Sequence, residues 1–247
     1  MADAAADFNR QGALYSGRAA LVYDRAVLRD NSEVRELIGL IRGKESVLLE
    51  LAAGSGRLTL PLARFAKAVV AVDASPELVD LLRKRVGEAA LSNVTVILED
   101  LFDFETSMTF DAVVIGTTSI AMFDRTQRRS LLRLARGWLN DTGRLVVSLY
   151  EPEDETSPVV LDDGRITVVE TSDVSAGMRT SVITETDSDG AVAGVYTGVT
   201  HIVTLEELRR EIGAEGFDLD AQVPVGDANG LGSLHHTLLV ARRSRSE

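Results

Sequence analysis

A glycine-bearing turn after a short apolar run contains the residues best suited to bind a ligand. Residues 48–57 read Leu-Leu-Glu-Leu-Ala-Ala-Gly-Ser-Gly-Arg. Glycine has no Cβ, so Gly54 and Gly56 let the backbone approach a ligand closely. The helix expected to begin here favours a negatively charged group at its N-terminus. The turn predicts a ligand site, although dinucleotide enzymes use the same device.

Three acidic residues accompany this turn. Glu50 lies inside the motif, Asp73 ends the next predicted strand, and Asp100 follows the third. A carboxylate at the position of Asp73 can accept hydrogen bonds from the two hydroxyls of a ribose. A dinucleotide fingerprint requires a third glycine in the spacing G-x-G-x-x-G, but Leu58 and Thr59 occupy that place. The pyrophosphate of a dinucleotide is therefore disfavoured.

The elements that must position these residues alternate between strand and helix. Short apolar runs predict buried strands, and the helix after Asp73 has Ser75 as N-cap and Pro76 at its first position. The expected strands are 46–51, 68–72, 94–98, 112–115 and 145–149, and the expected helices are 58–65, 75–90 and 126–139. Strands joined by helical crossovers predict a parallel sheet with helices on both faces.

The two ends of the chain extend this pattern. Two helices are expected within residues 14–42. After Pro152, strand-like alternation without helices predicts an antiparallel insertion at 165–171, 178–186 and 192–203. A helix at 204–213 then begins with a capping box of Thr204 and Glu207, and strands at 217–225 and 234–242 complete the sheet.

The chain resembles the class I S-adenosylmethionine-dependent methyltransferases, in the branch that modifies natural products. Four segments carry the likeness: Glu-Leu-Ala-Ala-Gly-Ser-Gly at 50–56, Val-Asp-Ala-Ser-Pro at 72–76, Glu-Asp-Leu at 99–101 and Phe-Asp-Ala-Val at 110–113. The resemblance covers roughly residues 15–150 and the final helix and strands. It implies an α/β fold, a doubly wound Rossmann-like sheet of seven strands with an antiparallel β insertion after the fifth, and S-adenosylmethionine as cofactor.

The resemblance also implies roles for individual residues. The glycine turn passes under the methionine part of the cofactor, Asp73 binds the ribose, and Asp100 contacts the adenine amino group with Leu101 against the ring. Tyr15 lies on a lid helix that covers the cofactor. The expected cofactor-binding residues are Tyr15, Arg18, Glu50, Ala52, Gly54, Gly56, Asp73, Ala74, Asp100, Leu101 and Thr117.

The same resemblance implies that the chain has four parts. Residues 1–45 form an N-terminal helical lid, and 46–152 form the cofactor-binding α/β core. Residues 153–203 form an antiparallel cover over the substrate, and 204–247 supply the final helix and the last two strands of the core sheet.

Catalysis of methyl transfer requires few side chains, because the sulfonium is already activated. The enzyme aligns and desolvates the acceptor and removes a proton where needed. His235, His201 and Tyr196 are the candidate bases. Neighbouring strand residues face opposite sides, so at most one of His235 and His236 points at the acceptor. Glu151 is a candidate to bind a cationic amine, although a free amine needs no base.

The charge balance restricts the class of partner. The chain has 26 Lys and Arg against 38 Asp and Glu, a net charge of -12, which disfavours nucleic acid and anionic membranes. It has no cysteine, which excludes disulfides and thiolate metal sites. The acidic pairs Asp162–Asp163 and Asp187–Asp189 are expected to be solvated, so no metal site is predicted. Without a signal peptide or a long apolar run, a soluble cytoplasmic protein is expected.

The expected function is methylation of a nitrogen on a natural-product-type acceptor, such as a sugar amine or a peptide N-terminal amine. The partner is thus a small molecule or a peptide, and the oligomeric state stays open. An O-methyltransferase acting on a small molecule is one alternative. A nicotinamide (NAD)-dependent oxidoreductase is another, although the chain lacks a Tyr-x-x-x-Lys pair after the fifth predicted strand. A binding module without catalysis is the third.

Overall fold

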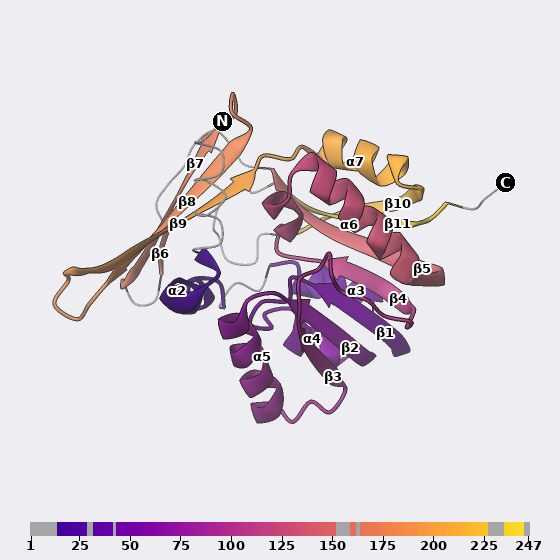
Figure 1. Ribbon diagram of the computed structural model, residues 1–247, viewed down its shortest axis with the longest axis horizontal. Coiled ribbons are helices and arrows are strands. Elements are labelled where there is room, and N and C mark those ends of the chain that lie inside the picture. The colour runs from indigo at the N-terminus through magenta and orange to yellow at the C-terminus, as the bar shows by residue number, and fades with distance from the viewer. Residues whose placement is uncertain are drawn as a thin grey trace.

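Two β-sheets and the helices around them make up the structure (Figure 1). The computed structural model describes residues 14–28, 32–41, 43–151, 159–161, 164–226 and 235–244. The larger sheet has the strand order β10-β11-β5-β4-β1-β2-β3. Its strands are β1 (Gly43–Leu51), β2 (Ala66–Asp73), β3 (Val94–Leu98), β4 (Phe110–Ile115), β5 (Leu139–Glu151), β10 (Phe217–Pro224) and β11 (His235–Arg243).

The topology confirms the predicted doubly wound sheet. Strands β1 to β5 pair in parallel, and β11 pairs antiparallel to both β5 and β10. The apolar runs form central strands because both faces are covered: Leu48 and Leu49 are each fully buried, on opposite faces of β1. Helices α6 (Arg125–Trp138) and α7 (Leu205–Ala214) cover one face. The other face is covered by α3 (Val34–Ile41), α4 (Thr59–Ala63) and α5 (Pro76–Glu88).

Local capping explains where these helices begin. The Ser75 hydroxyl accepts a hydrogen bond from Leu78 N at 3.3 Å, as predicted. The Thr204 hydroxyl accepts from Glu207 N at 3.1 Å, while the Glu207 carboxylate binds Arg128 at 2.8 Å. Helix α6 has a complete capping box, with Asp124 as its N-cap.

The start of the fifth strand differs most from the prediction. The sequence pattern extends a helix to residue 139 and begins the fifth strand at 145, whereas β5 begins at Leu139. The strand changes register against β4 between Phe110 and Ala112. A Cβ on Gly143 would lie 2.7 Å from the Phe110 carbonyl oxygen, so glycine allows β5 to pass close to β4 there.

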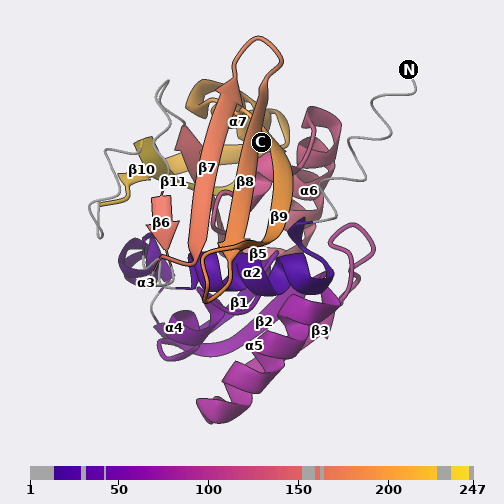
Figure 2. The same ribbon diagram turned by 90° about the vertical axis from the view of Figure 1, so that its left-hand side faces the viewer.

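The insertion forms the second sheet, with the order β6-β7-β8-β9. Its antiparallel strands are β6 (Val159–Leu161), β7 (Ile166–Asp173), β8 (Met178–Thr186) and β9 (Val192–His201). The last three match the predicted strands, and β6 adds a short fourth. Helix α2 (Gly17–Val27) crosses the lower ends of β7 to β9 in Figure 2 and packs its Val22 against Ile166 and Ile183. We call this face of the insertion its inner face.

Candidate active site

The glycine turn adopts a backbone that few residues tolerate. Ala52, Gly54 and Gly56 have φ angles of 54°, 56° and 95°, in the left-handed region. A Cβ on Gly56 would lie 2.4 Å from Leu82 Cδ1 of α5, so this position requires glycine. Ala53 N donates to the Val72 carbonyl at 3.1 Å and joins the turn to β2. The turn is thus held against the carboxyl end of the neighbouring strand.

Asp73 occupies that strand end. Its Oδ2 accepts a hydrogen bond from Gly54 N at 2.7 Å, and its Oδ1 accepts one from Ser75 N at 2.8 Å. The residue is 9% exposed. Burial raises the pKa of Asp73, although the hydrogen bonds from the backbone of Ser75, Gly54 and Ala74 act in the opposite direction. The carboxylate is therefore fixed beside the turn.

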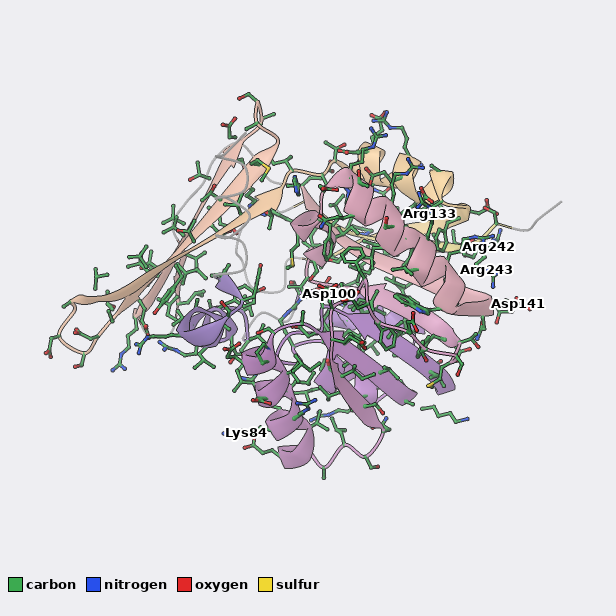
Figure 3. All side chains as sticks on the ribbon, in the orientation of Figure 1. Lys84, Asp100, Arg133, Asp141, Arg242 and Arg243 are labelled. Carbon is green, nitrogen blue, oxygen red and sulfur yellow. The ribbon has the colours of Figure 1, made fainter. Side chains whose placement is uncertain are left out.

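The third strand delivers a polar and an apolar residue together. Asp100 is exposed, and its Oδ1 accepts a hydrogen bond from Phe102 N at 2.9 Å. Leu101 is 6% exposed and belongs to the main core. Figure 3 labels Asp100 near the middle of the view, away from the charged residues labelled at the rim.

Helix α2 is attached directly to the glycine turn. Both carboxylate oxygens of Asp24 lie 2.7 Å from the guanidinium nitrogens of Arg85 in α5. The Ser55 hydroxyl also donates to Asp24, and Arg85 Nη1 donates to the Ser55 carbonyl at 3.1 Å. Asp24 is 4% exposed. We call Asp24, Ser55 and Arg85 the α2 latch; sequence analysis missed it because its members lie far apart in the chain.

Tyr15 lies next to this helix and close to Asp73. Its ring meets that of Tyr23 edge to face, with centroids 5.0 Å apart. Burial raises the pKa of Tyr15 well above its ordinary value, and the neighbouring Tyr23 and the charges of Asp73 and Glu170 raise it further. Tyr15 therefore lies beside Tyr23 and under the influence of the Asp73 charge, and its role in a lid over the cofactor stays a prediction.

Arg18 and Tyr196 lie elsewhere. Arg18 Nη2 lies 2.9 Å from Glu185 Oε2 of β8, and Arg25 binds the other carboxylate oxygen at 2.8 Å. Hydrogen bonds to Glu185 and then to Tyr196 raise the pKa of Arg18. Tyr196 packs with the apolar residues between α2 and the insertion. The Arg18 guanidinium thus attaches α2 to the second sheet, and its expected contact with the cofactor stays a prediction.

A buried polar cluster lies under the loop after β4. Glu33 is fully buried, and its Oε1 accepts hydrogen bonds from Thr117 N at 2.8 Å and from Arg57. Arg57 Nη2 also donates to Thr117 Oγ1 at 2.8 Å. His236 Nε2 lies 3.4 Å from Glu33 Oε2 and 2.6 Å from Ser148 Oγ. The cluster ties Thr117, with its left-handed φ of 54°, to the segment after β1 and to β5 and β11.

The charge of Glu33 is compensated within this cluster. Burial alone raises the pKa of this carboxyl, but the hydrogen bond with His236 and the positive charge of Arg57 outweigh it and lower the pKa. Glu33 contacts a residue 84 positions away, so no local pattern marks it as part of the site. Glu33 and His236 are the main residues of this cluster that the sequence analysis did not assign to the site.

Glu50 lies beneath the turn and not on its surface. It is 2% exposed, and burial raises its pKa to about 8, while Thr59 and Arg57 lower it and the charges of Glu33 and Asp73 raise it. The side chain therefore supports the turn from the interior of the protein and keeps its proton at neutral pH.

Replacing Glu50 by glutamine tests this environment. Folded protein holds the Glu50 proton up to about pH 8, whereas the unfolded chain releases it near 4.5. The unfolded state then binds fewer protons, so wild-type stability falls across this window by up to about 1.4 kcal/mol per pH unit. Glutamine has no proton to lose, so Glu50→Gln is expected to gain stability relative to the wild type as the pH rises.

Urea unfolding of both proteins near both ends of this window measures the effect. The difference in free energy of unfolding between variant and wild type should be larger at the alkaline end. An equal difference at both ends would show that Glu50 titrates normally in the folded protein.

The remaining candidate bases are separated from one another. Burial and the charge of Arg128 lower the pKa of His201, which places this residue near the start of α6. Glu151 Oε1 accepts a hydrogen bond from Leu205 N at 2.8 Å and so fixes the start of α7. His235 begins β11, but its side chain lies outside the described part of the structure. Its neighbour His236 faces the Glu33 cluster.

These residues fit a nucleoside cofactor. The turn has left-handed backbone at Gly54, where a Cβ would have no neighbour closer than 4.0 Å, a carboxylate stands at the end of β2, and the exposed Asp100 follows β3 next to the apolar Leu101. Asp73, Asp100, Leu101, Ala74 and the glycine turn would hold such a group. The fold and site therefore define a nucleoside-cofactor enzyme of the doubly wound α/β class.

Comparisons with known proteins identify the class further. Residues 48–143 match the family described as "Methyltransferase domain". The glycopeptide N-methyltransferase MtfA is 27% identical, with a TM-score of 0.65 over 85% of this chain and 89% of that one. MtfA has also been solved with S-adenosyl-L-methionine. Residues 48–143 thus form a methyltransferase domain, and S-adenosylmethionine is the cofactor, as predicted.

Two further solved structures share the fold. The CcbJ methyltransferase from Streptomyces caelestis is 18% identical, with a TM-score of 0.74 over 90% of this chain and 96% of that one. S-adenosylmethionine-bound CalS10 from Micromonospora echinaspora, an amino pentose methyltransferase, is 21% identical, with a TM-score of 0.70 over 90% and 97%.

A further relative matches a shorter stretch of the chain. The probable ribosomal RNA small subunit methyltransferase A of Methanosphaera stadtmanae is 31% identical over 88 residues, which are 36% of this chain and 29% of that protein. The chain thus matches less than a third of that relative's length. Among the described residues, no helix combines the length and apolar character needed to cross a membrane.

Proposed function

We propose that this enzyme transfers the methyl group of S-adenosylmethionine to a nitrogen of a natural-product-type acceptor, either a sugar amine or a peptide amine. The observation that carries the proposal is the 27% identity to a glycopeptide N-methyltransferase across 85% of this chain. The likeness extends well beyond residues 48–143, because it covers 85% of this chain.

The electrostatics of the site support an amine acceptor. The net charge of -12 and the carboxylates of Asp73 and Asp100 favour the approach of cationic groups. An amine needs only to lose one proton and to meet the methyl carbon in line with the sulfur. We add His236 to the predicted candidates His235, His201 and Tyr196 for that proton, because His236 contacts the cluster that holds Thr117.

Isotopically labelled S-adenosylmethionine tests the proposed function. The enzyme is incubated with amino sugars, peptides with free N-termini, and phenols or alcohols that lack an amine. We expect S-adenosylhomocysteine to form with an amine acceptor, whose mass rises by one methylene group per transfer. Labelling of the hydroxyl compounds alone would replace the proposal with O-methylation, and cofactor binding without any turnover would contradict it.

A further inference from the structure

The inner face of the insertion changes from apolar to polar along its strands. Ile166 and Ile183, near α2, are buried and apolar. Farther along the same face, β7 and β8 pair Glu170 with Ser181, and Ser172 with Arg179. We call these four residues the inner polar patch. Polar side chains on a covered face are costly unless they are hydrogen-bonded, so the patch requires a physical explanation.

Part of the patch is satisfied internally. Arg179 forms an ion pair with Glu170, and the Ser181 hydroxyl donates to Glu170 Oε1 at 2.9 Å. Arg179 Cζ also lies 4.4 Å from the ring centroid of Tyr150, which stands near the carboxyl end of β5. This contact places the patch above the edge of the core sheet where the cofactor turn also lies. Figure 1 shows the two sheets as separate layers, and the contact between Arg179 and Tyr150 joins them.

The apolar part of the same face lies beside Tyr15, because Tyr15 and Val168 of β7 pack against one cluster. The charges of Asp73 and Glu170 both raise the pKa of Tyr15. In the register of the core sheet, Tyr150 pairs with His236. The patch thus faces the region in which an acceptor must meet the cofactor.

Two polar atoms of the patch are buried and have no hydrogen-bond partner among the described residues: Arg179 Nε and Ser172 Oγ. The Arg179 side chain is 16% exposed and that of Glu170 is 35% exposed. A buried donor without an acceptor costs folding free energy, which a ligand oxygen placed between these atoms would recover. The patch can therefore offer an N–H donor, a hydroxyl and an accessible carboxylate to one ligand.

The net charge of the patch indicates which kind of ligand oxygen it can bind. Arg179 and Glu170 neutralise each other, so an anionic group gains little from this guanidinium. A sugar hydroxyl is neutral and both donates and accepts, which matches a carboxylate and an N–H side by side. We propose that the inner polar patch binds the hydroxyl groups of a sugar ring, so that the acceptor is an amino sugar or an amino-sugar glycoside. This inference rests on the proposed function.

Two variants and a matched control test the assignment. Arg179→Lys keeps the positive charge beside Glu170 but removes the Nε donor, and Ser172→Ala removes the hydroxyl. Thr180→Ala is the control, because Thr180 lies between Arg179 and Ser181 on the opposite face of β8. The probes are amino-sugar methyl glycosides with the amine on different ring carbons, and a short peptide with a free N-terminus.

Each protein is assayed for methylation of these probes, and its affinity for S-adenosylhomocysteine is measured by calorimetry. We expect the KM for the amino sugar to rise about tenfold or more in Arg179→Lys and severalfold in Ser172→Ala. Thr180→Ala should match the wild type, and all four proteins should bind S-adenosylhomocysteine equally. This pattern separates an acceptor contact from a general loss of structure.

Three results would overturn the assignment. Unchanged KM values in Arg179→Lys and Ser172→Ala would remove the patch from the acceptor site. Methylation of the peptide but of no amino sugar by the wild type would reject the sugar while N-methylation stands. Methylation of neither kind of amine would reject the proposed function together with the inference.

Discussion

Asp73→Ala is expected to weaken S-adenosylmethionine binding by about 1.5 to 3 kcal/mol, roughly 10- to 150-fold in Kd. The variant lacks the carboxylate that would accept hydrogen bonds from the ribose. It also removes the acceptor for Gly54 N, which Asp73 Oδ2 binds at 2.7 Å, so the glycine turn loses one of its anchors. Both losses act on the same site, which is why this substitution should have a larger effect than others in the crevice.

Calorimetric titration with S-adenosylmethionine and S-adenosylhomocysteine measures this change. Asp80→Ala is a matched control, because Asp80 is an aspartate on α5 with a side chain that is 78% exposed. The control should bind both compounds as the wild type does. If folded Asp73→Ala protein kept the wild-type Kd, Asp73 would not belong to the cofactor site.

The core of this site was predictable because its signals are local. The turn needs glycine at Gly56, where Leu82 leaves no room for a Cβ, and a capped helix start follows Asp73 at Ser75. Such requirements are visible in the types of a few neighbouring residues of the sequence. The same holds for the strand pattern, since apolar runs with both faces buried differ from the alternating strands of the insertion.

The supporting contacts were not predictable for the opposite reason. Glu33 binds Thr117 across 84 residues, and Asp24 binds Arg85 across 61. A buried carboxylate has no periodicity of its own, and its partner is defined only when the sheet brings distant segments together. Arg18 illustrates the same limit, because it lies on a helix that the sequence predicts, whereas its partner, Glu185, lies on the insertion.

Asp24→Ala is expected to release helix α2 from the glycine turn. The substitution leaves the guanidinium of Arg85, which is 17% exposed, without the carboxylate that it binds through two nitrogens. Removing one member of a buried ion pair costs about 3 to 5 kcal/mol. Because α2 touches the core through few other elements, this loss should appear as local opening of the helix more than as global unfolding.

Opening of α2 should lower cofactor affinity, because only the closed population binds fully. Limited trypsin digestion measures the opening, since α2 contains Arg18 and Arg25, and calorimetry measures the affinity for S-adenosylmethionine. We expect cleavage in α2 to accelerate and the Kd to rise about tenfold or more. The core should stay resistant to the protease under the same conditions.

The double variant Asp24→Leu, Arg85→Met distinguishes the latch from mere packing. It removes both charges and restores apolar volume, so it should recover much of the protease resistance that Asp24→Ala loses. Ser55→Ala removes one hydrogen bond from the same carboxylate and should have a milder effect. If Asp24→Ala kept α2 intact and bound the cofactor as the wild type does, then the contacts between α2 and the insertion, including Arg18 with Glu185, would suffice to hold the lid.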